Sequence, residues 1–207
     1  MTKKVEVAEA LLNVGAVRLS VSEPFTFTSG IKSPIYCDNR KMIGTVAERN
    51  IIIDGFVELL NEIDFDIVAG TATAGIPWSA FIAERMNKPM AYIRSKPKDY
   101  GAGKQIEGAD VDGKKVVVIE DLISTGGSSI KAVEATRKEG GIVVEVTAIF
   151  SYEFEKAVNN FKEADTGLRT ITNFSTLLEV AKDKNVIDGE QLELASKWNK
   201  SPDTWGR

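Results

Sequence analysis

Hydrophobic residues recur along this chain with two different periods, and the periods predict helices and strands in alternation. Within 45–60, Ile53, Phe56, Val57 and Leu60 follow the i, i+3, i+4, i+7 spacing of one buried helix face. Further helical patterns are found at 5–14, 76–86 and 127–139. Short apolar runs predict buried strands at 66–70, 89–94, 115–119 and 142–150, with a short edge strand at 169–172.

This alternation predicts the fold class. Parallel strands need crossover connections, so the pattern favours an α/β protein: a mostly parallel central sheet with helices on both faces. No repeat, low-complexity stretch or linker divides the 207 residues, so we expect a single domain over 1–207. Ligands of such sheets bind beyond the carboxyl ends of the strands, where the loops after residues 70, 94 and 119 would converge.

The stretch 116–129, VVVIEDLISTGGSS, carries the most informative pattern. An apolar strand leads into two adjacent carboxylates, Glu120 and Asp121, and then into small residues before a helix begins. Small residues let backbone N–H groups gather around an anion, and the helix dipole adds about half a positive charge there. Carboxylates cannot help to hold a phosphate, but they suit sugar hydroxyls or a metal. The pattern favours a site for a phosphorylated sugar; the alternative is a pair of solvated turn acids.

Two other loops follow predicted strands. The loop 70–77, GTATAGIP, has Ile76 and Pro77 where a Walker A motif needs Lys and Ser or Thr, so that interpretation is discarded. It is either a turn whose amides approach a second anion or an ordinary tight turn. The segment 94–110 is polar and long, and Arg94 with three lysines would give a lid a positive inner surface. The alternative is a solvated hairpin tip.

Composition and charge narrow the chemistry. The chain has no histidine, which excludes the usual zinc ligand sets, Ser-His nucleophile pairs and imidazole acid–base catalysis. Lys and Arg number 26 against 30 acidic residues, and this net charge of −4 argues against a nucleic-acid partner bound through a broad basic face. We find no signal peptide or membrane span, and the single cysteine, Cys37, permits no internal disulfide. These features predict a cytoplasmic protein with no membrane partner.

Three motifs give the chain a resemblance to a known family. The stretch 116–129 resembles the phosphoribosyltransferases that use phosphoribosyl pyrophosphate (PRPP). Two more, FTFTSGIKSPIYCDNRK at 25–41 and YIRSKPKDYGAGKQIEG at 92–108, narrow the resemblance to the orotate phosphoribosyltransferases. The resemblance covers nearly the whole chain. It implies the type I phosphoribosyltransferase fold, with a small N-terminal hood at about 1–41 and a mobile lid loop at about 95–109.

The resemblance also implies a reaction. A glycosyltransferase (pentosyltransferase) of this family transfers the ribose 5-phosphate group from PRPP to orotate. The products are orotidine 5-phosphate and pyrophosphate, and the step belongs to de novo pyrimidine (UMP) biosynthesis. The implied cofactor is Mg²⁺, held mainly through the substrate rather than by metal-ligating residues of the chain. The implied assembly is a homodimer with shared active sites.

Site residues follow from the resemblance position by position. Lys98 and Asp121 are the implied catalytic residues, and orotate is expected at Ser124, Lys32 and Tyr36. The loop 71–75 should face the pyrophosphate. PRPP is expected to contact Arg94, Lys98, Tyr100, Glu120, Asp121, Leu122, Ile123, Ser124, Thr125, Gly126, Gly127 and Ser128. Within this set, the two acids would hold the ribose 2- and 3-hydroxyls, and residues 124–128 the 5-phosphate.

The chain departs from the family pattern in two places. Many relatives carry His where Tyr100 stands, and a phenol brings no positive charge. Some relatives carry Arg after the strand that ends near residue 150, where Tyr152 and Glu153 stand here. The orotate carboxylate must then find other donors, for which backbone amides near Gly30 and the side chain of Lys32 are hypotheses.

Two alternative functions stay open. One is a phosphoribosyltransferase for another base, purine or uracil, and the hood stretch 25–41 argues against it. The other is a regulator that senses PRPP without catalysis, with nucleic acid as its partner. Such a regulator would need no basic lid and should have a basic face, which this composition does not favour.

Overall fold

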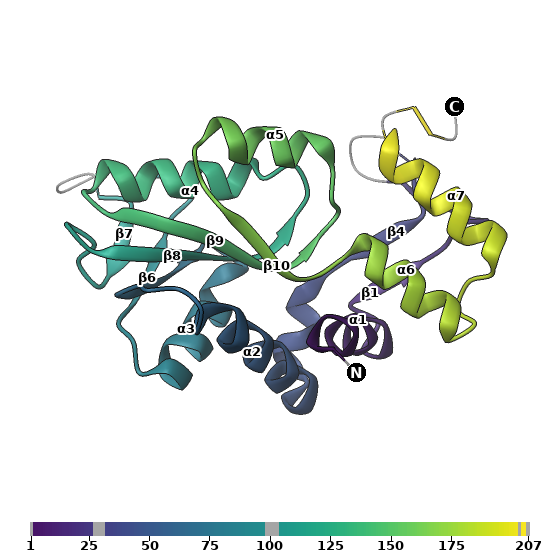
Figure 1. The fold of residues 1–207 in the computed structure, drawn as a ribbon, viewed down its shortest axis with the longest axis horizontal. Coiled ribbons are helices and arrows are strands. Elements are labelled where there is room, and N and C mark those ends of the chain that lie inside the picture. Colours follow the sequence, from purple (N-terminus) through teal and green to yellow (C-terminus); the bar gives the residue numbers. More distant parts are fainter. Residues whose placement is uncertain (1, 27–31, 98–103, 203, 206–207) are drawn as a thin grey trace.

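A six-stranded sheet forms the centre of the molecule, a computed structural model that describes residues 2–26, 32–97, 104–202 and 204–205 (Figure 1). Its strand order is β10-β9-β8-β5-β6-β7, and all neighbours run parallel except β6 and β7. The strands are β5 (Ile67–Thr71), β6 (Met90–Ile93), β7 (Ile106–Gly108), β8 (Lys115–Ile123), β9 (Ile142–Ser151) and β10 (Leu168–Asn173). The predicted fold class is confirmed.

Helices cover both faces of this sheet, as expected. Figure 1 shows α4 (Gly127–Lys138) and α5 (Glu155–Glu163) on one face, and α2 (Val46–Leu60) and α3 (Gly75–Met86) on the other. The side chains of β8 alternate between two buried clusters: Val117 and Ile119 belong to one, Val116 and Val118 to the other. This alternation follows from the pleat, and it explains why the strand is apolar at every position. Within the described part of the chain, no helix has both the length and the hydrophobicity to cross a bilayer.

The N-terminal segment and the C-terminal helices form a second, smaller layer beside the sheet (Figure 1). The indole Nε1 of Trp198 donates to the carbonyl of Lys32 at 3.1 Å and so joins the two ends of the chain. The Trp198 ring also packs against Tyr152, Phe154 and Phe174 at centroid distances of 5.5–5.8 Å. The elements of this layer are α1 (Lys3–Asn13), β1 (Val17–Leu19), β2 (Phe25–Thr26), β3 (Lys32–Ser33), β4 (Ile35–Cys37), the 3₁₀ helix η1 (Asn39–Gly44), α6 (Phe174–Asp183) and α7 (Gly189–Lys200).

Three features differ from the sequence-based expectation. Strand β8 continues to Ile123, past the predicted end at 119, because β9 pairs with it as far as the Ile123–Ser151 partners. Glu120 and Asp121 therefore lie inside the end of a strand rather than after it. Strand β7 occupies part of the segment interpreted as a loop, and it pairs antiparallel with β6. Helices α5 and α6 were not predicted.

Candidate functional site

Three central strands, β5, β6 and β8, are aligned side by side near their carboxyl ends. Gly70 in β5 pairs with Tyr92 in β6 on one side and with Ile119 in β8 on the other. The loops after β5 and β6 therefore leave the sheet at the same edge, as predicted, whereas β8 stays paired with β9 as far as Ile123 before its loop begins. This edge brings together the acids of β8, the loop after β5 and Arg94.

The β8–α4 turn (residues 124–128) connects the acids to helix α4. Gly126 caps the helix with φ of 79°, in the left-handed region, and a Cβ there would lie 2.6 Å from the buried ring of Phe161. Only glycine fits both the angle and the space. The first backbone N–H groups of α4 have no intrahelical acceptor, so the turn offers donors to an anion beside the positive end of the helix dipole.

The two acids differ in burial and share one hydrogen-bonded cluster. The Glu120 side chain is only 5% exposed, and it accepts from the Asp121 N–H at 3.1 Å and the Ser128 hydroxyl at 3.3 Å. Burial, and then the nearby Asp121 charge, raise the pKa of Glu120 to about 8. Burial also raises the pKa of Asp121. A ligand whose hydroxyl groups donate hydrogen bonds to these carboxylates, or that brings positive charge, would favour the ionised forms of both acids.

The loop after β5 packs against β8 through glycine. A Cβ on Gly75 would lie 2.3 Å from the carbonyl oxygen of Ile119, and one on Gly70 would lie 2.4 Å from the Ser79 hydroxyl. Helix α3 therefore begins against Ile119, the residue that precedes Glu120 in β8. At the end of β5, the buried Thr71 hydroxyl has no hydrogen-bond partner within the described residues.

Arg94 follows β6 at the same edge. Its backbone exchanges hydrogen bonds with Gln105: the Arg94 N–H donates to the Gln105 carbonyl at 2.9 Å, and the Gln105 side chain donates back at 2.6 Å. The buried Nη1 of its guanidinium has no hydrogen-bond partner among the residues described. Lys96 is exposed. Lys98 and Tyr100, two of the predicted site residues, lie outside the described residues.

The N-terminal layer meets the acids through the β4–η1 segment (residues 35–44). Asn39 donates its side-chain amide to the carbonyl oxygen of Asp121 at 2.7 Å. Tyr36, three residues earlier, is half-buried, and the Arg18 guanidinium lies 5.1 Å from its ring centroid. Lys32 is exposed, and its ammonium group donates to the Thr26 hydroxyl at 2.8 Å. Tyr36 is therefore linked to the acids through the short chain segment that leads to Asn39. The Lys32 ammonium instead bonds to Thr26 of the paired strand β2.

The position where some relatives carry Arg has a structural role here. Tyr152 is buried and stacks on Phe154 with centroids 5.3 Å apart. The Glu153 carboxylate accepts from the backbone and hydroxyl of Ser175 at 2.9 and 2.6 Å. These contacts hold helix α6 against the end of β9, so this position supplies no cation to the site.

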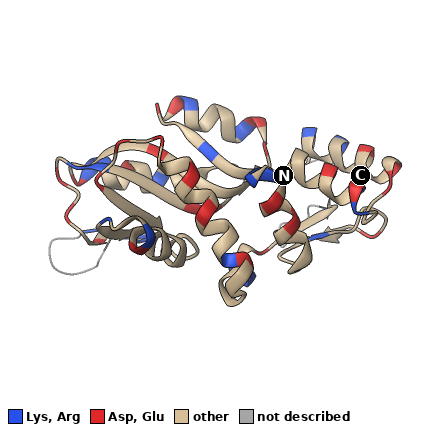
Figure 2. Cartoon of the chain, turned by 60° about the horizontal axis from the view of Figure 1, so that its bottom comes forward, with Lys and Arg blue, Asp and Glu red and all other residues tan. Residues whose placement is uncertain are grey.

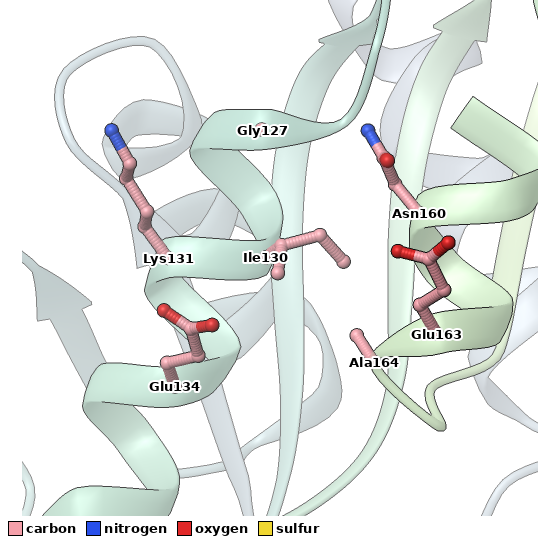
Figure 3. Close-up of a pocket in the computed structure, with 7 residues that line it drawn as sticks. All are labelled: Gly127, Ile130, Lys131, Glu134, Asn160, Glu163 and Ala164. Atoms are coloured by element: carbon pink, nitrogen blue, oxygen red, sulfur yellow. The ribbon is translucent and has the colours of Figure 1, made fainter. Parts of the chain in front are cut away.

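Two asparagines of this site were missed by sequence reasoning. Asn39 bonds to Asp121, and Asn160 of α5 donates to the carbonyl of Thr125 at 2.8 Å. Each bond joins residues that are far apart in sequence. Asn39 lies within the motif 25–41, but the motif gave it no role, and Asn160 lies outside the three motifs of the resemblance. A groove of about 340 Å³ lies between α4 and α5. Figure 3 shows Asn160 on the α5 side of this groove, opposite Lys131 of α4. Figure 2 shows acidic and basic residues interspersed along the described elements.

Comparison with known proteins gives the family. The chain matches the model of the phosphoribosyl transferase domain over residues 45–184. It is 51% identical to the orotate phosphoribosyltransferase of Streptococcus mutans, over 99% of both chains.

Solved structures agree. One is the UMP synthase of Leishmania donovani, with a TM-score of 0.78 and 28% identity; the match covers 94% of this chain and 42% of that longer one. Another is the Mycobacterium tuberculosis orotate phosphoribosyltransferase in complex with PRPP, with a TM-score of 0.66, 25% identity and coverage of 84% and 98%. Backbone amides and paired acids at the carboxyl edge of the sheet thus accompany full-length similarity, and the chain belongs to the orotate phosphoribosyltransferase family.

Proposed function

We propose that this protein transfers the ribose 5-phosphate group from PRPP to orotate, forming orotidine 5-phosphate and pyrophosphate in pyrimidine biosynthesis. The observation that carries the proposal is the end of β8, where the buried Glu120 and the half-buried Asp121 lead directly into the amide-rich β8–α4 turn. This arrangement suits a sugar with hydroxyls at one end and a phosphate at the other. The family membership fits the same substrate.

Each end of the donor has its own set of groups in this proposal. Glu120 and Asp121 accept hydrogen bonds from the ribose 2- and 3-hydroxyls. The backbone from Leu122 to Ser128 binds the 5-phosphate. That phosphate is remote from the bond that breaks, so its binding energy can orient the reacting carbon without being changed by the reaction.

The pyrophosphate is assigned to the loop 71–75 and to Arg94, Lys98 and Tyr100. The unpartnered Thr71 hydroxyl and Arg94 Nη1 support this assignment, because buried polar groups are usually satisfied by a ligand or water if not by protein. The lid at about 95–109 is a proposal, and its residues 98–103 lie outside the described part of the chain.

No protein nucleophile is needed for the reaction. The N1 atom of orotate forms the bond to the anomeric carbon, while the bond from that carbon to the pyrophosphate oxygen breaks. The proton of N1 passes to the departing pyrophosphate. Ser124, Lys32 and Tyr36 are proposed to hold the base. Alignment of two substrates is worth on the order of 7–11 kcal/mol. Positive charge from Lys98 and Arg94 would stabilise the departing pyrophosphate.

The proposed cofactor is Mg²⁺ carried by the substrate. Among the described residues, no group of three or more His, Cys, Asp or Glu side chains could hold a metal. The ion would be bound mainly by PRPP oxygens, because this hard cation prefers oxygen ligands. When bound, the ion would offset the negative charge of the pyrophosphate. We also propose a homodimer, in which Lys98 and Tyr100 serve the partner's site, and a cytoplasmic location, which the single cysteine favours.

A direct assay tests the proposal. The protein is incubated with PRPP and Mg²⁺ and with orotate, uracil, hypoxanthine or adenine in turn, and ultraviolet absorbance follows loss of each base. We expect turnover with orotate alone. Turnover with a different base would assign another specificity, and PRPP binding without turnover on any base would favour the sensing regulator.

A further inference from the structure

Asn39 is the buried polar group that connects the two layers of the molecule at the candidate site. It is the first residue of η1, two positions after the last residue of β4, and it is 1% exposed. Its amide nitrogen donates to the Asp121 carbonyl at 2.7 Å, and its amide oxygen accepts from the Cys37 thiol at 3.2 Å. Because both amide atoms are used, the side chain has one orientation: the reverse would place its oxygen against the carbonyl oxygen.

The bond from Asn39 to the Asp121 carbonyl takes the place of a hydrogen bond from a neighbouring strand. The β5–β8 ladder ends at the Gly70–Ile119 pair, although β8 continues to Ile123. The carbonyls of Ile119 and Asp121 point to the same side of the strand, because alternate residues do so. The Ile119 carbonyl faces the start of α3, and the Asp121 carbonyl has lost its neighbouring strand. The Asn39 amide satisfies this carbonyl, which would otherwise be left without its partner away from water.

The same bond links two parts of the candidate site: the acids at the end of β8 and the segment that contains β4. Holding the Asp121 carbonyl fixes its peptide plane and thereby the direction in which the neighbouring carboxylates point. Asn39 is also three residues from Tyr36 in β4, the strand on the side proposed for the base. The bond to the Asp121 carbonyl therefore positions β4 as well. A neutral amide does this without adding a third negative charge beside Glu120 and Asp121.

The neighbours of Asn39 support its orientation. Burial raises the pKa of the Cys37 thiol above its ordinary value, and the nearby charges of Asp121 and Asp38 add to this effect. The thiol therefore stays protonated and able to donate to the amide oxygen. Arg40, the next residue, pairs with Asp38 at 2.6 Å and holds the chain on the outer side of this turn.

We propose that Asn39 is a positioning residue that fixes the base-side strand β4 relative to the ribose-side acids, through its amide bond to the Asp121 carbonyl. The inference rests on the proposed function, because it needs a base at one end of this distance and a ribose at the other. Asn39 touches neither substrate in this scheme. Its effect is on the alignment of two bound substrates and not on the affinity for the donor alone.

The test compares Asn39→Ala with Asn160→Ala. Both variants remove a side-chain amide that holds one carbonyl near the acids and the β8–α4 turn, but Asn160 holds Thr125 at the phosphate end. For each, the measurements are kcat, the KM for orotate, the dissociation constant of PRPP alone by calorimetry, and the melting temperature. For Asn39→Ala we expect kcat to fall at least 10-fold and the KM for orotate to rise, with PRPP affinity within 3-fold of the parent. For Asn160→Ala we expect mainly weaker PRPP binding.

Each outcome has a defined meaning. If Asn39→Ala retains the kcat and orotate KM of the parent, or loses activity only in proportion to its folded fraction, the positioning role is wrong. If that variant fails to fold, Asn39→Ser, which keeps a shorter donor, takes its place: a fall of 3-fold or more in kcat with unchanged PRPP affinity supports the role, and a parent-like kcat overturns it. A parent without orotate turnover overturns the proposed function and this inference together, whereas an active parent isolates the inference.

Discussion

The two ends of the candidate site are built in different ways. At the phosphate end, the β8–α4 turn depends on the main chain: Gly126 adopts a left-handed angle and lies against Phe161. The base end is built from two short two-stranded sheets, β1–β4 and β2–β3, and from η1. Single side-chain bonds connect these elements to the rest: Asn39 of η1 to Asp121, and Trp198 to Lys32 of β3. One end is therefore specified by a local sequence and the other by contacts between distant residues.

The largest effect is expected from a substitution at the phosphate end. Gly126→Ala should lower the free energy of unfolding by about 2–4 kcal/mol, because it combines left-handed strain with a collision against Phe161. The matched control is Gly113→Ala: Gly113 also has positive φ, but no atom lies within 4 Å of its Cβ position, so a cost of about 1 kcal/mol is expected. Urea unfolding measures both, and equal costs would show that the packing against Phe161 is unimportant.

A substitution at the base end should have a separable effect. Trp198→Phe removes the donor to the Lys32 carbonyl and part of a fully buried ring, at a cost of about 2 kcal/mol. We expect the KM for orotate to rise while PRPP binding is retained, because the β8–α4 turn makes no use of this indole. Steady-state kinetics with each substrate varied in turn tests this. Equal weakening of both substrates would mean that the two ends do not respond separately.

The acids between the two ends predict a pH dependence. The pKa of Glu120 is raised to about 8 in the folded protein, whereas an unfolded glutamate ionises at its ordinary value of 4.5. Between these values the unfolded state has released a proton that the folded state keeps, so stability falls as pH rises. Glu120→Gln removes this loss.

Unfolding at pH 5 and pH 8 checks the sign. We expect Glu120→Gln to gain stability over the parent on going to pH 8, by on the order of 2 kcal/mol, since one pKa unit corresponds to about 1.4 kcal/mol and the two acids share the effect. A parent that becomes more stable than the variant over the same range would contradict the assigned direction.

The smallest effect is expected at the surface of the base end. Asp38 pairs with Arg40, and this pair holds the pKa of Asp38 below its usual value, but the arginine side chain is 66% exposed. Solvent screens such pairs, so Asp38→Asn should change the free energy of unfolding by less than about 0.5 kcal/mol. A larger loss of unfolding free energy in chemical denaturation would contradict this expectation and would show that the Asp38–Arg40 pair stabilises the β4–η1 segment.

The same contrast explains what could be predicted from the sequence. The strand, the two acids, the small residues and the helix after them are adjacent in the chain, so periodicity and turn chemistry located them. The reach of β8 to Ile123 could not be predicted, because it depends on pairing with Ser151 of another strand. Likewise, the partners of Asn39 and Asn160 could not be predicted, because they lie 82 and 35 positions away, even though Asn39 stands within the motif 25–41.

The bond between Trp198 and Lys32 has a consequence for synthesis of the protein. A ribosome releases the β8–α4 turn well before it releases helix α7, so a growing chain can assemble its donor-binding end first. The base-binding end waits for the indole and can acquire its final shape only once α7 has emerged. On the proposed function, the part of the site assigned to orotate is therefore completed later in synthesis than the part assigned to PRPP.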